Sequence, residues 1–280
     1  RGLPRGSVSD RLPPPRKRFG QHFLHDSRAL DAIVDALGPL TGRTVLEIGP
    51  GRGALTDRLV DRASHVVAIE LDRDLAARLR IQHASNAHVQ IVEADVLDVP
   101  LGSVAQGPYV LAGNVPYYIT TPILFHALEH PRPDIAVYLV QREVADRMGA
   151  SPGSKIYGAL SVNLQLFAKV EFIRAVGAKS FTPPPKVESA IVRVIPHAEP
   201  LLEAALEGAF RTFVIGAFGL RRKQLVRVLR TLTPLDAEAC TEVLQSCGID
   251  PMARPETLAP SAFADLVRAL VARGVTLRGS

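Results

Sequence analysis

The sequence predicts an α/β fold with a mostly parallel sheet, followed by a smaller all-helical part. Short β-branched runs alternate with amphipathic stretches between residues 44 and 148, which is typical of βαβ units. Beyond Pro196 only helical patterns occur. A chain of 280 residues is long enough for one large domain and a small one.

Apolar residues every three or four positions predict a first helix over Ser27–Leu37, with Asp26 or Ser27 as its N-cap. The next expected elements are strand Thr44–Ile48, helix Ala54–Ala63, strand His65–Ile69, helix Asp72–Ile81, strand His88–Val92, strand Tyr109–Ala112, helix Pro122–Leu128, strand Ile135–Val140, helix Val144–Met148 and helix Ala159–Phe167. Two further strands, Val170–Ala175 and Ser189–Ile195, have no helix between them. They predict an antiparallel, hairpin-like pair at the edge of the sheet.

Four helical stretches with no strands between them predict the second domain. They are Leu201–Phe213, Arg221–Leu229, Asp236–Cys247 and Pro260–Ala272. We therefore expect a core over residues 19–197, a helical domain over 198–274 and a short tail over 275–280. The boundary is expected near Pro196–Pro200.

The composition, 47% hydrophobic and 22% charged, is that of an ordinary soluble globular protein. No apolar run is long enough for a membrane span, and no signal peptide is visible. Cys240 and Cys247 are seven residues apart on one predicted helix, where they cannot form a disulfide. They indicate reduced thiols and hence a cytoplasmic location.

The positive charge is concentrated at the N-terminus. Residues 1–20 hold six Lys/Arg and one Asp, which accounts for the whole net charge of +5. This segment is rich in Pro and Gly and has no periodicity, so residues 1–18 are predicted to be a disordered basic tail. Arg16, Lys17 and Arg18 are candidate contacts to a polyanion such as nucleic acid, and a purely solubilising tail is the alternative.

Three predicted strand ends carry residues suited to a nucleotide. Gly49 and Gly51 follow the first strand in the run Glu47–Gly53, where the missing Cβ lets a ligand approach the main chain. Glu70 ends the second strand and can accept two ribose hydroxyls, and Asp95 follows the third strand and can accept from an adenine amine. The spacing G-P-G-R-G favours an adenosyl ligand without a pyrophosphate over NAD. Taken singly, the glycines are turn residues and both acids are helix caps.

Asn114-Val115-Pro116-Tyr117 ends a fourth strand. A residue before proline is held extended, so main-chain carbonyls here point away from the ladder. One amide, exposed carbonyls and an aromatic face within four residues suit a flat base that carries an exocyclic amine. The alternative is an ordinary turn with a packed tyrosine.

Five motifs together resemble the ribosomal RNA adenine-N6 dimethyltransferase family, and they are closest to its small-subunit branch. They are Phe19-Gly20-Gln21-His22-Phe23-Leu24, Glu47-Ile48-Gly49-Pro50-Gly51, Asn114-Val115-Pro116-Tyr117, Phe181-Thr182-Pro183-Pro184-Pro185-Lys186-Val187 and Arg221-Arg222-Lys223. The resemblance runs from about Arg16 to Arg268. It implies a Rossmann-like class I methyltransferase core with a small C-terminal helical domain.

The resemblance also implies the ligands and the site. The cofactor is S-adenosyl-L-methionine, held by His22, Leu24, Gly49, Gly51, Glu70, Asp95 and Asn114. The family commonly has Asn in place of His22, and His22 can titrate and make cofactor binding sensitive to pH. Tyr118 also departs from the family, which usually has Asn there.

In the expected mechanism, the Asn114 side-chain oxygen and the Pro116 carbonyl accept the two N–H bonds of an adenine amine. Tyr117 and Phe181 stack on the two faces of the extruded base. The alternative for Phe181 is a core aromatic residue at the start of a loop. Near-attack alignment supplies roughly 7–11 kcal/mol of the barrier, and no general base is required before transfer. A metal site is not expected, because His22 and His25 have no Cys or acidic partner at ligand spacing.

The expected activity is dimethylation of two adjacent adenines near the 3′ end of small-subunit ribosomal RNA, by a monomer acting on an immature subunit. Arg221, Arg222 and Lys223 are expected to contact RNA phosphates, with a solvated helix face as the alternative. Competing functions are the large-subunit enzyme of macrolide resistance, and a non-catalytic assembly or transcription factor. An NAD-dependent oxidoreductase is disfavoured by the glycine spacing.

Overall fold

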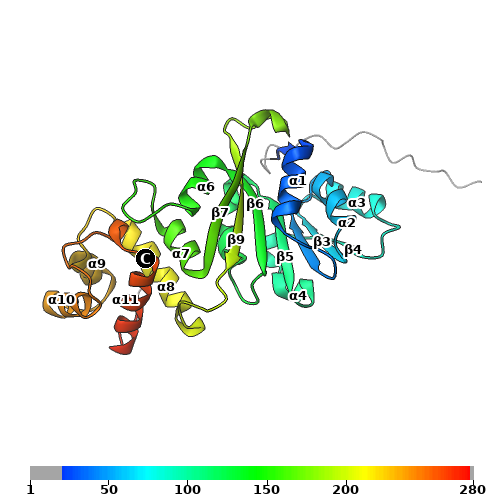
Figure 1. Ribbon diagram of the computed structural model, residues 1–280. Coiled ribbons are helices and arrows are strands. Elements are labelled where there is room, and N and C mark those ends of the chain that lie inside the picture. The colour runs from blue at the N-terminus through cyan, green and yellow to red at the C-terminus, as the bar shows by residue number, and fades with distance from the viewer. Residues whose placement is uncertain (1–20, 278–280) are drawn as a thin grey trace, which may run out of the picture. The chain divides into compact units, whose positions relative to one another are not determined.

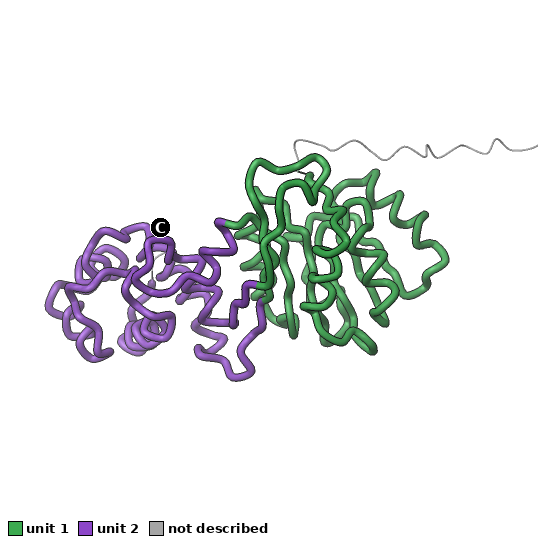
Figure 2. The backbone as a smooth tube through the Cα atoms, turned by 45° about the horizontal axis from the view of Figure 1, so that its top comes forward, with its two compact units in different colours: residues 1–142, 173–193 green, residues 143–172, 194–280 purple. Residues whose placement is uncertain are grey.

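The computed structural model describes residues 21–277, which form two compact units (Figure 2). Unit 1 holds the described residues up to Arg142 together with Ile173–Arg193. Unit 2 holds Glu143–Phe172 and the described residues from Val194 onward. The predicted basic tail, with Arg16, Lys17 and Arg18, lies outside the described residues.

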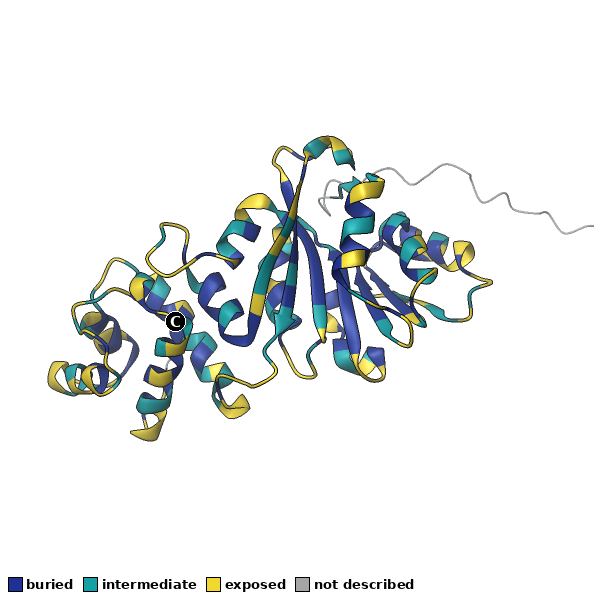
Figure 3. Cartoon of the chain, viewed as in Figure 1, coloured by how far each residue is buried: buried dark blue, intermediate teal, exposed yellow. Residues whose placement is uncertain are grey.

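The predicted parallel sheet is confirmed in unit 1 (Figure 1). Its strands are β2 (Thr44–Ile48), β3 (His65–Glu70), β4 (Val89–Glu93), β5 (Tyr109–Asn114) and β6 (Ile135–Gln141). They lie in the order β4-β3-β2-β5-β6, and each neighbouring pair is parallel. Strands β2, β3, β5 and β6 are buried almost from end to end (Figure 3), as expected of a parallel sheet covered on both faces.

The strand order creates a switch point between β2 and β5. From β2 the chain proceeds outward through β3 and β4, and then returns to the other side of β2 as β5. Loops that leave the carboxyl ends of β2 and β5 therefore turn in opposite directions and leave a crevice, which is the usual ligand position in open α/β sheets.

The helices of unit 1 begin where the sequence predicts caps. Their bounds are α1 Ser27–Ala36, α2 Ala54–Val60, α3 Arg73–Gln82, α4 Leu101–Ala105 and α5 Thr120–His126. Asp26 accepts a hydrogen bond from the Ala29 amide (3.0 Å), and Asp72 accepts one from the Asp74 amide (3.0 Å). Helix α2 is shorter than predicted, and α4 was not predicted at all.

Two edge strands complete the seven-stranded sheet. They are β9 (Ser189–Pro196), next to β6, and β7 (Ala168–Val176), at the edge. The expectation that these two strands lie side by side at the sheet edge is confirmed.

A separate two-stranded sheet joins segments that are far apart in the chain. In it β1 (Phe23–Leu24) pairs antiparallel with β8 (Phe181–Thr182), so that Leu24 faces Phe181 across the ladder. Neither strand was predicted, because two residues are too few to show a pattern. The pairing brings the first and fourth of the five sequence motifs together.

Unit 2 is helical, with a core rich in aromatic residues. Its helices are α6 (Arg142–Met148, whose first residue belongs to unit 1), α7 (Ala159–Phe167), α8 (Glu207–Gly219), α9 (Leu225–Leu232), α10 (Ala237–Ser246) and α11 (Pro260–Ala272). Phe263 of α11 contacts Phe213 and Phe218 of α8, with ring centroids 6.4 and 5.9 Å away. Residues 143–172 join this unit, whereas the sequence analysis assigned them to the core.

Two helix predictions in unit 2 are wrong at their starts. The helix expected from Leu201 begins at Glu207, after a short 3₁₀ turn. The helix expected from Arg221 begins at Leu225, because residues 220–223 close α8 with turn hydrogen bonds instead. Lys223 therefore does not share a helix face with the basic residues of α9.

Candidate active site

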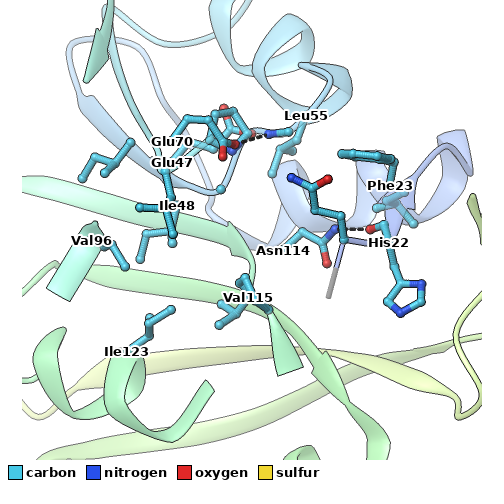
Figure 4. Close-up of a pocket in the computed structure, with 18 of the residues that line it drawn as sticks. His22, Phe23, Glu47, Ile48, Leu55, Glu70, Val96, Asn114, Val115 and Ile123 are labelled. Carbon is cyan, nitrogen blue, oxygen red and sulfur yellow. Dashed lines mark hydrogen bonds between the residues drawn. The ribbon is translucent and has the colours of Figure 1, made fainter. Parts of the chain in front are cut away.

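A cavity of about 1080 Å³, open to solvent, lies at the carboxyl ends of β2, β3, β4 and β5 (Figure 4). It is lined mainly by residues 21–24, 47–52, 69–71, 94–96 and 114–119. Every predicted cofactor residue is in this lining, as are Pro116 and Tyr117. Phe181 is the one predicted catalytic residue that is not.

The loop after β2 depends on glycine conformations. Gly49 and Gly51 have φ of +64° and +59°, in the left-handed region that side chains disfavour. A Cβ on Gly51 would lie 3.0 Å from the Phe23 ring. The guanidinium carbon of Arg52 lies over the same ring, 4.3 Å from its centroid. Gly51 thus lets the N-terminal arm, residues 21–24, close against the loop.

Glu70 fixes this loop from the end of β3. Its carboxylate accepts the Gly51 amide (2.9 Å) with one oxygen and the Asp72 amide (2.8 Å) with the other. The side chain is buried, and burial raises the pKa of Glu70 although both main-chain bonds oppose that shift. A carboxylate has about four lone-pair sites, so two remain for a ligand.

Glu47 is a site residue that the sequence analysis did not single out. It lines the cavity, is only 1% exposed, and accepts a hydrogen bond from Thr56 Oγ1 (2.7 Å). Burial raises the pKa of Glu47 to about 8. The sequence feature that could have identified it is an acidic residue within a mainly apolar strand, two positions before Gly49.

We expect the free energy of unfolding of Glu47→Gln to depend less on pH than that of the parent protein. The folded state holds a proton on Glu47 up to about pH 8, whereas an unfolded chain releases it near 4.5. The free energy of unfolding therefore falls as pH rises between those values, by roughly a few kcal/mol at about 1.4 kcal/mol per pH unit.

Urea unfolding of the parent and Glu47→Gln at pH 5, 7 and 9 measures the effect. The two proteins should differ in pH dependence, with the variant flatter over this window. If the free energy of unfolding changed with pH equally in both proteins, the pKa of Glu47 would not be raised in the folded state.

Asp95 caps a turn, as the simpler of its two predicted roles requires, and it also lies in the cavity. Its Oδ1 accepts the Leu97 amide (3.0 Å) and caps the 3₁₀ turn Val96–Asp98, which is the simple structural role. It also lines the cavity while remaining partly exposed. The second carboxylate oxygen remains for a donor in the cavity.

Asn114 ends β5 with its amide held in one orientation. Its Nδ2 donates to the main-chain carbonyl of His22 (3.0 Å), as Figure 4 shows. Because a carbonyl only accepts, this bond assigns the nitrogen to the His22 side and leaves Oδ1 as a free acceptor. The predicted acceptor role of Asn114 is compatible with this geometry.

The expected role of the Pro116 carbonyl is not compatible with the structure. That oxygen already accepts from the Ile119 amide (3.2 Å) and from Thr120 Oγ1 (3.1 Å). Both of its lone pairs are thus engaged at the turn into α5. Among the described residues, the Val115 carbonyl accepts no hydrogen bond. Val115 is also the residue that the following proline holds extended.

Tyr117 is fixed at its hydroxyl and covered on its ring. The hydroxyl pairs with Ser189 Oγ (2.6 Å), and burial raises the pKa of Tyr117. The His22 ring stacks on it, with centroids 5.7 Å apart and planes 26° apart. His22 Nδ1 also donates to the Pro183 carbonyl (2.8 Å). His22 therefore links the N-terminal arm to Tyr117 and to the loop after β8.

Phe181 is a core residue, and its predicted stacking role is contradicted. Its side chain is only 2% exposed and belongs to the hydrophobic core that includes Leu24 and Ile191. The antiparallel pairing of β8 with β1 directs it there. The structure thus supports the alternative that was considered for Phe181, a core aromatic residue at the start of a loop.

The basic cluster of unit 2 divides into two kinds of residue. Arg221 Nε pairs with the Glu256 carboxylate, and its Nη2 donates to the Lys155 carbonyl (3.0 Å). The guanidinium of Arg221 therefore holds a loop, a structural role that was not predicted for it. Arg222 and Lys223 are exposed.

The described part of the chain has neither a metal-binding cluster nor a membrane-spanning helix. Within residues 21–277, no group of three or more His, Cys, Asp and Glu is placed to hold a metal ion. None of the helices in that range has both the length and the apolar character that a membrane crossing requires.

Known proteins resemble the chain over most of its length. The family model described as ribosomal RNA adenine dimethylase matches residues 14–270. The ribosomal RNA small subunit methyltransferase A of Bordetella pertussis is 46% identical over 265 residues, 92% of this chain and 95% of that protein. The protein of the same description from Idiomarina loihiensis is 43% identical over 246 residues, 87% of this chain and 83% of that one.

Solved structures show the same fold. A dimethyladenosine transferase from Plasmodium falciparum superposes with a TM-score of 0.79 at 27% identity, over 92% of this chain and 100% of that one. The 23S rRNA methyltransferase ErmE superposes with a TM-score of 0.69 at 30% identity, over 89% of this chain and 99% of that one. These similarities confirm the predicted Rossmann-like methyltransferase core.

Proposed function

The chain belongs to the ribosomal RNA adenine dimethylase family, and from this premise we propose that it methylates the N6 atoms of adenines in small-subunit ribosomal RNA with S-adenosylmethionine. The observation that carries the proposal is one cavity shared by the glycine loop, Glu70 and Asn114. A nucleotide-type site and an amine-accepting site thus adjoin within unit 1.

The residues of the cavity fit an adenosyl cofactor. The glycine loop presents main chain without Cβ atoms, and Glu70 keeps two acceptor positions for ribose hydroxyls beside its two main-chain bonds. Asp95 keeps one oxygen for an adenine amine. When bound, S-adenosylmethionine supplies an electrophilic methyl group.

We assign recognition of the target amine to Asn114 Oδ1 and the Val115 carbonyl. The first is oriented by the His22 bond, and the second is the only carbonyl of residues 115 and 116 that is not engaged within the described chain. When these two oxygens each accept a hydrogen bond from one N–H group, they hold the amine nitrogen in place and direct its lone pair. This positioning, rather than a general base, lowers the barrier.

Tyr117 supplies the stacking face for the extruded base. Its hydroxyl bond to Ser189 holds the outer end of the ring in place. The ring of His22, not Phe181, is the aromatic group that lies against it. We propose further that the targets are two adjacent adenosines near the 3′ end, methylated in an immature small subunit by a monomer in the cytoplasm.

Methyl transfer from labelled S-adenosylmethionine tests the function directly. Unmethylated small subunits should take up label, and nuclease mapping should locate it on adenines. Absence of label on any ribosomal RNA, with a folded protein that binds no S-adenosylmethionine in calorimetry, would instead support a non-catalytic factor.

The similarity to ErmE is the observation that supports the alternative activity, on large-subunit RNA. The higher identity to small-subunit enzymes, 43–46%, favours the first substrate. Parallel assays on unmethylated small subunits and on naked large-subunit RNA decide between them by which RNA is labelled.

The two kinds of basic residue in unit 2 should respond differently to substitution. Arg222→Ala with Lys223→Ala should weaken binding to small subunits and reduce the slope of log affinity against log salt by about 0.7–0.9 per lost phosphate contact. Arg221→Ala should instead lower the melting temperature, because it leaves the Glu256 carboxylate and the Lys155 carbonyl without this partner.

Filter binding at several salt concentrations and thermal melting separate these effects. An unchanged salt slope in the Arg222→Ala, Lys223→Ala protein would exclude this pair from the RNA interface.

A further inference from the structure

Tyr118 is an exposed aromatic residue at the rim of the cavity. It lines the cavity and is nevertheless 55% exposed. It occupies the 3₁₀ turn Tyr117–Ile119, in which successive side chains diverge by about 120°. Tyr117 is therefore directed into the protein, toward Ser189, while Tyr118 is directed outward. Within residues 21–277 no hydrogen bond to the Tyr118 hydroxyl is present.

The position of this ring is more informative than its exposure. Single exposed apolar side chains are ordinary on protein surfaces. Tyr118, however, is three residues beyond Val115 and shares its cavity with both proposed amine acceptors. An RNA strand that delivers a base to Asn114 can therefore pass along Tyr118, which is exposed at the same cavity and four residues away in the chain.

Extrusion of the target base leaves the neighbouring base without a stacking partner, which an aromatic ring can replace. When an adenine leaves the stack, the base next to it loses a stacking neighbour. A flat aromatic side chain replaces that surface without requiring a particular base. An Asn at this position, as the resembling family usually has, would offer a small polar group instead.

We infer that Tyr118 is a stacking platform for the nucleotide adjacent to the extruded adenine. This inference rests on the proposed function and extends it from the target base to the neighbouring one. Tyr118 is thus a positioning residue for RNA, and it neither touches the reacting amine nor holds the cofactor.

Three variants test the platform with unmethylated small subunits as substrate. Tyr118→Leu should raise KM for the subunit by roughly 5- to 150-fold, the value of one base–aromatic stack. Tyr118→Asn should behave like Tyr118→Leu, and Tyr118→Phe should keep the parental KM because the hydroxyl makes no bond. The effect on kcat should be smaller than that on KM, and the Kd for S-adenosylmethionine should not change.

Phe172→Leu is the matched control. It removes an aromatic ring of similar exposure, 49%, that does not line the cavity. A direct reporter is 2-aminopurine placed beside the target adenine, in an RNA fragment that the parental enzyme methylates. Its fluorescence should stay quenched with the parent and with Tyr118→Phe, and rise with Tyr118→Leu.

The outcomes separate this inference from the proposed function. If the parent methylates RNA but Tyr118→Leu keeps the parental KM and the quenched fluorescence, Tyr118 is not a platform. A raised Kd for S-adenosylmethionine in Tyr118→Leu, or an equal rise of KM in Phe172→Leu, would also overturn the assignment. If the parent methylates no ribosomal RNA, it is the proposed function that fails.

Discussion

Replacing Asn114 with Ala is expected to lower kcat for methyl transfer by about 10²–10³-fold, the cost of losing one preorganised hydrogen-bonding group at a reacting centre. The substitution removes the proposed acceptor Oδ1 and also the Nδ2 bond to the His22 carbonyl. Asn114 is only partly buried at the end of β5, so the parallel ladder before it should survive.

Single-turnover methylation of small subunits at saturating cofactor measures this effect. Asn86→Ala is the matched control, because it removes a side-chain amide outside the cavity that pairs with the ring of the neighbouring His83. The melting temperature should be close to parental in both variants, and saturating cofactor is used because Asn114 is also an expected cofactor contact. A parental kcat in Asn114→Ala would refute the assignment of the amine site.

Replacing Glu70 with Ala is expected to weaken S-adenosylmethionine binding by roughly 10²- to 10⁴-fold, since two hydrogen bonds to a charged acceptor are lost at about 1.5–3 kcal/mol each. The variant also leaves the Gly51 and Asp72 amides without their acceptor, so part of the loss comes from a loosened loop. Glu70→Gln keeps one oxygen acceptor and should have an intermediate affinity.

The pH dependence of binding supplies a second measurement on Glu70. Burial raises the pKa of this carboxyl, and its proton must leave before both oxygens can accept. Affinity in the parent should therefore fall as pH is lowered through the raised pKa, earlier than for an exposed glutamate.

Calorimetric titrations over a pH series test the role of Glu70. Glu93→Gln is the control, because Glu93 ends the neighbouring strand β4, is exposed and pairs with Arg80 outside the cavity. The same weakening in Glu93→Gln, or no weakening in Glu70→Ala, would remove Glu70 from the cofactor site.

Local patterns were sufficient for most of unit 1. β-branched runs gave the five parallel strands within one or two residues, and Asp26 and Asp72 marked helix starts correctly. Strand propensity and capping act over a few neighbours, so a single sequence contains the information. Predictions were poorest within unit 2, where the closing turn of α8 and Arg221 replace the first turn of a helix that the spacing favoured.

The sequence by itself determined the parallel sheet, the order of ligand-binding loops at its carboxyl edge, and the identity of Gly49, Glu70, Asp95 and Asn114 as cavity residues. Only the tertiary structure decided that Phe181 is in the core, that His22 covers Tyr117, that the Pro116 carbonyl is engaged, and that Arg221 holds a loop. The physical reason is range. A strand or a cap depends on adjacent residues, whereas the surroundings of Phe181, His22 and Arg221 depend on partners that are distant in the chain, more than 150 residues away in the case of Phe181 and Leu24. The Pro116 carbonyl has partners near in sequence, Ile119 and Thr120, but the donors it binds are fixed only by the conformation of the turn into α5.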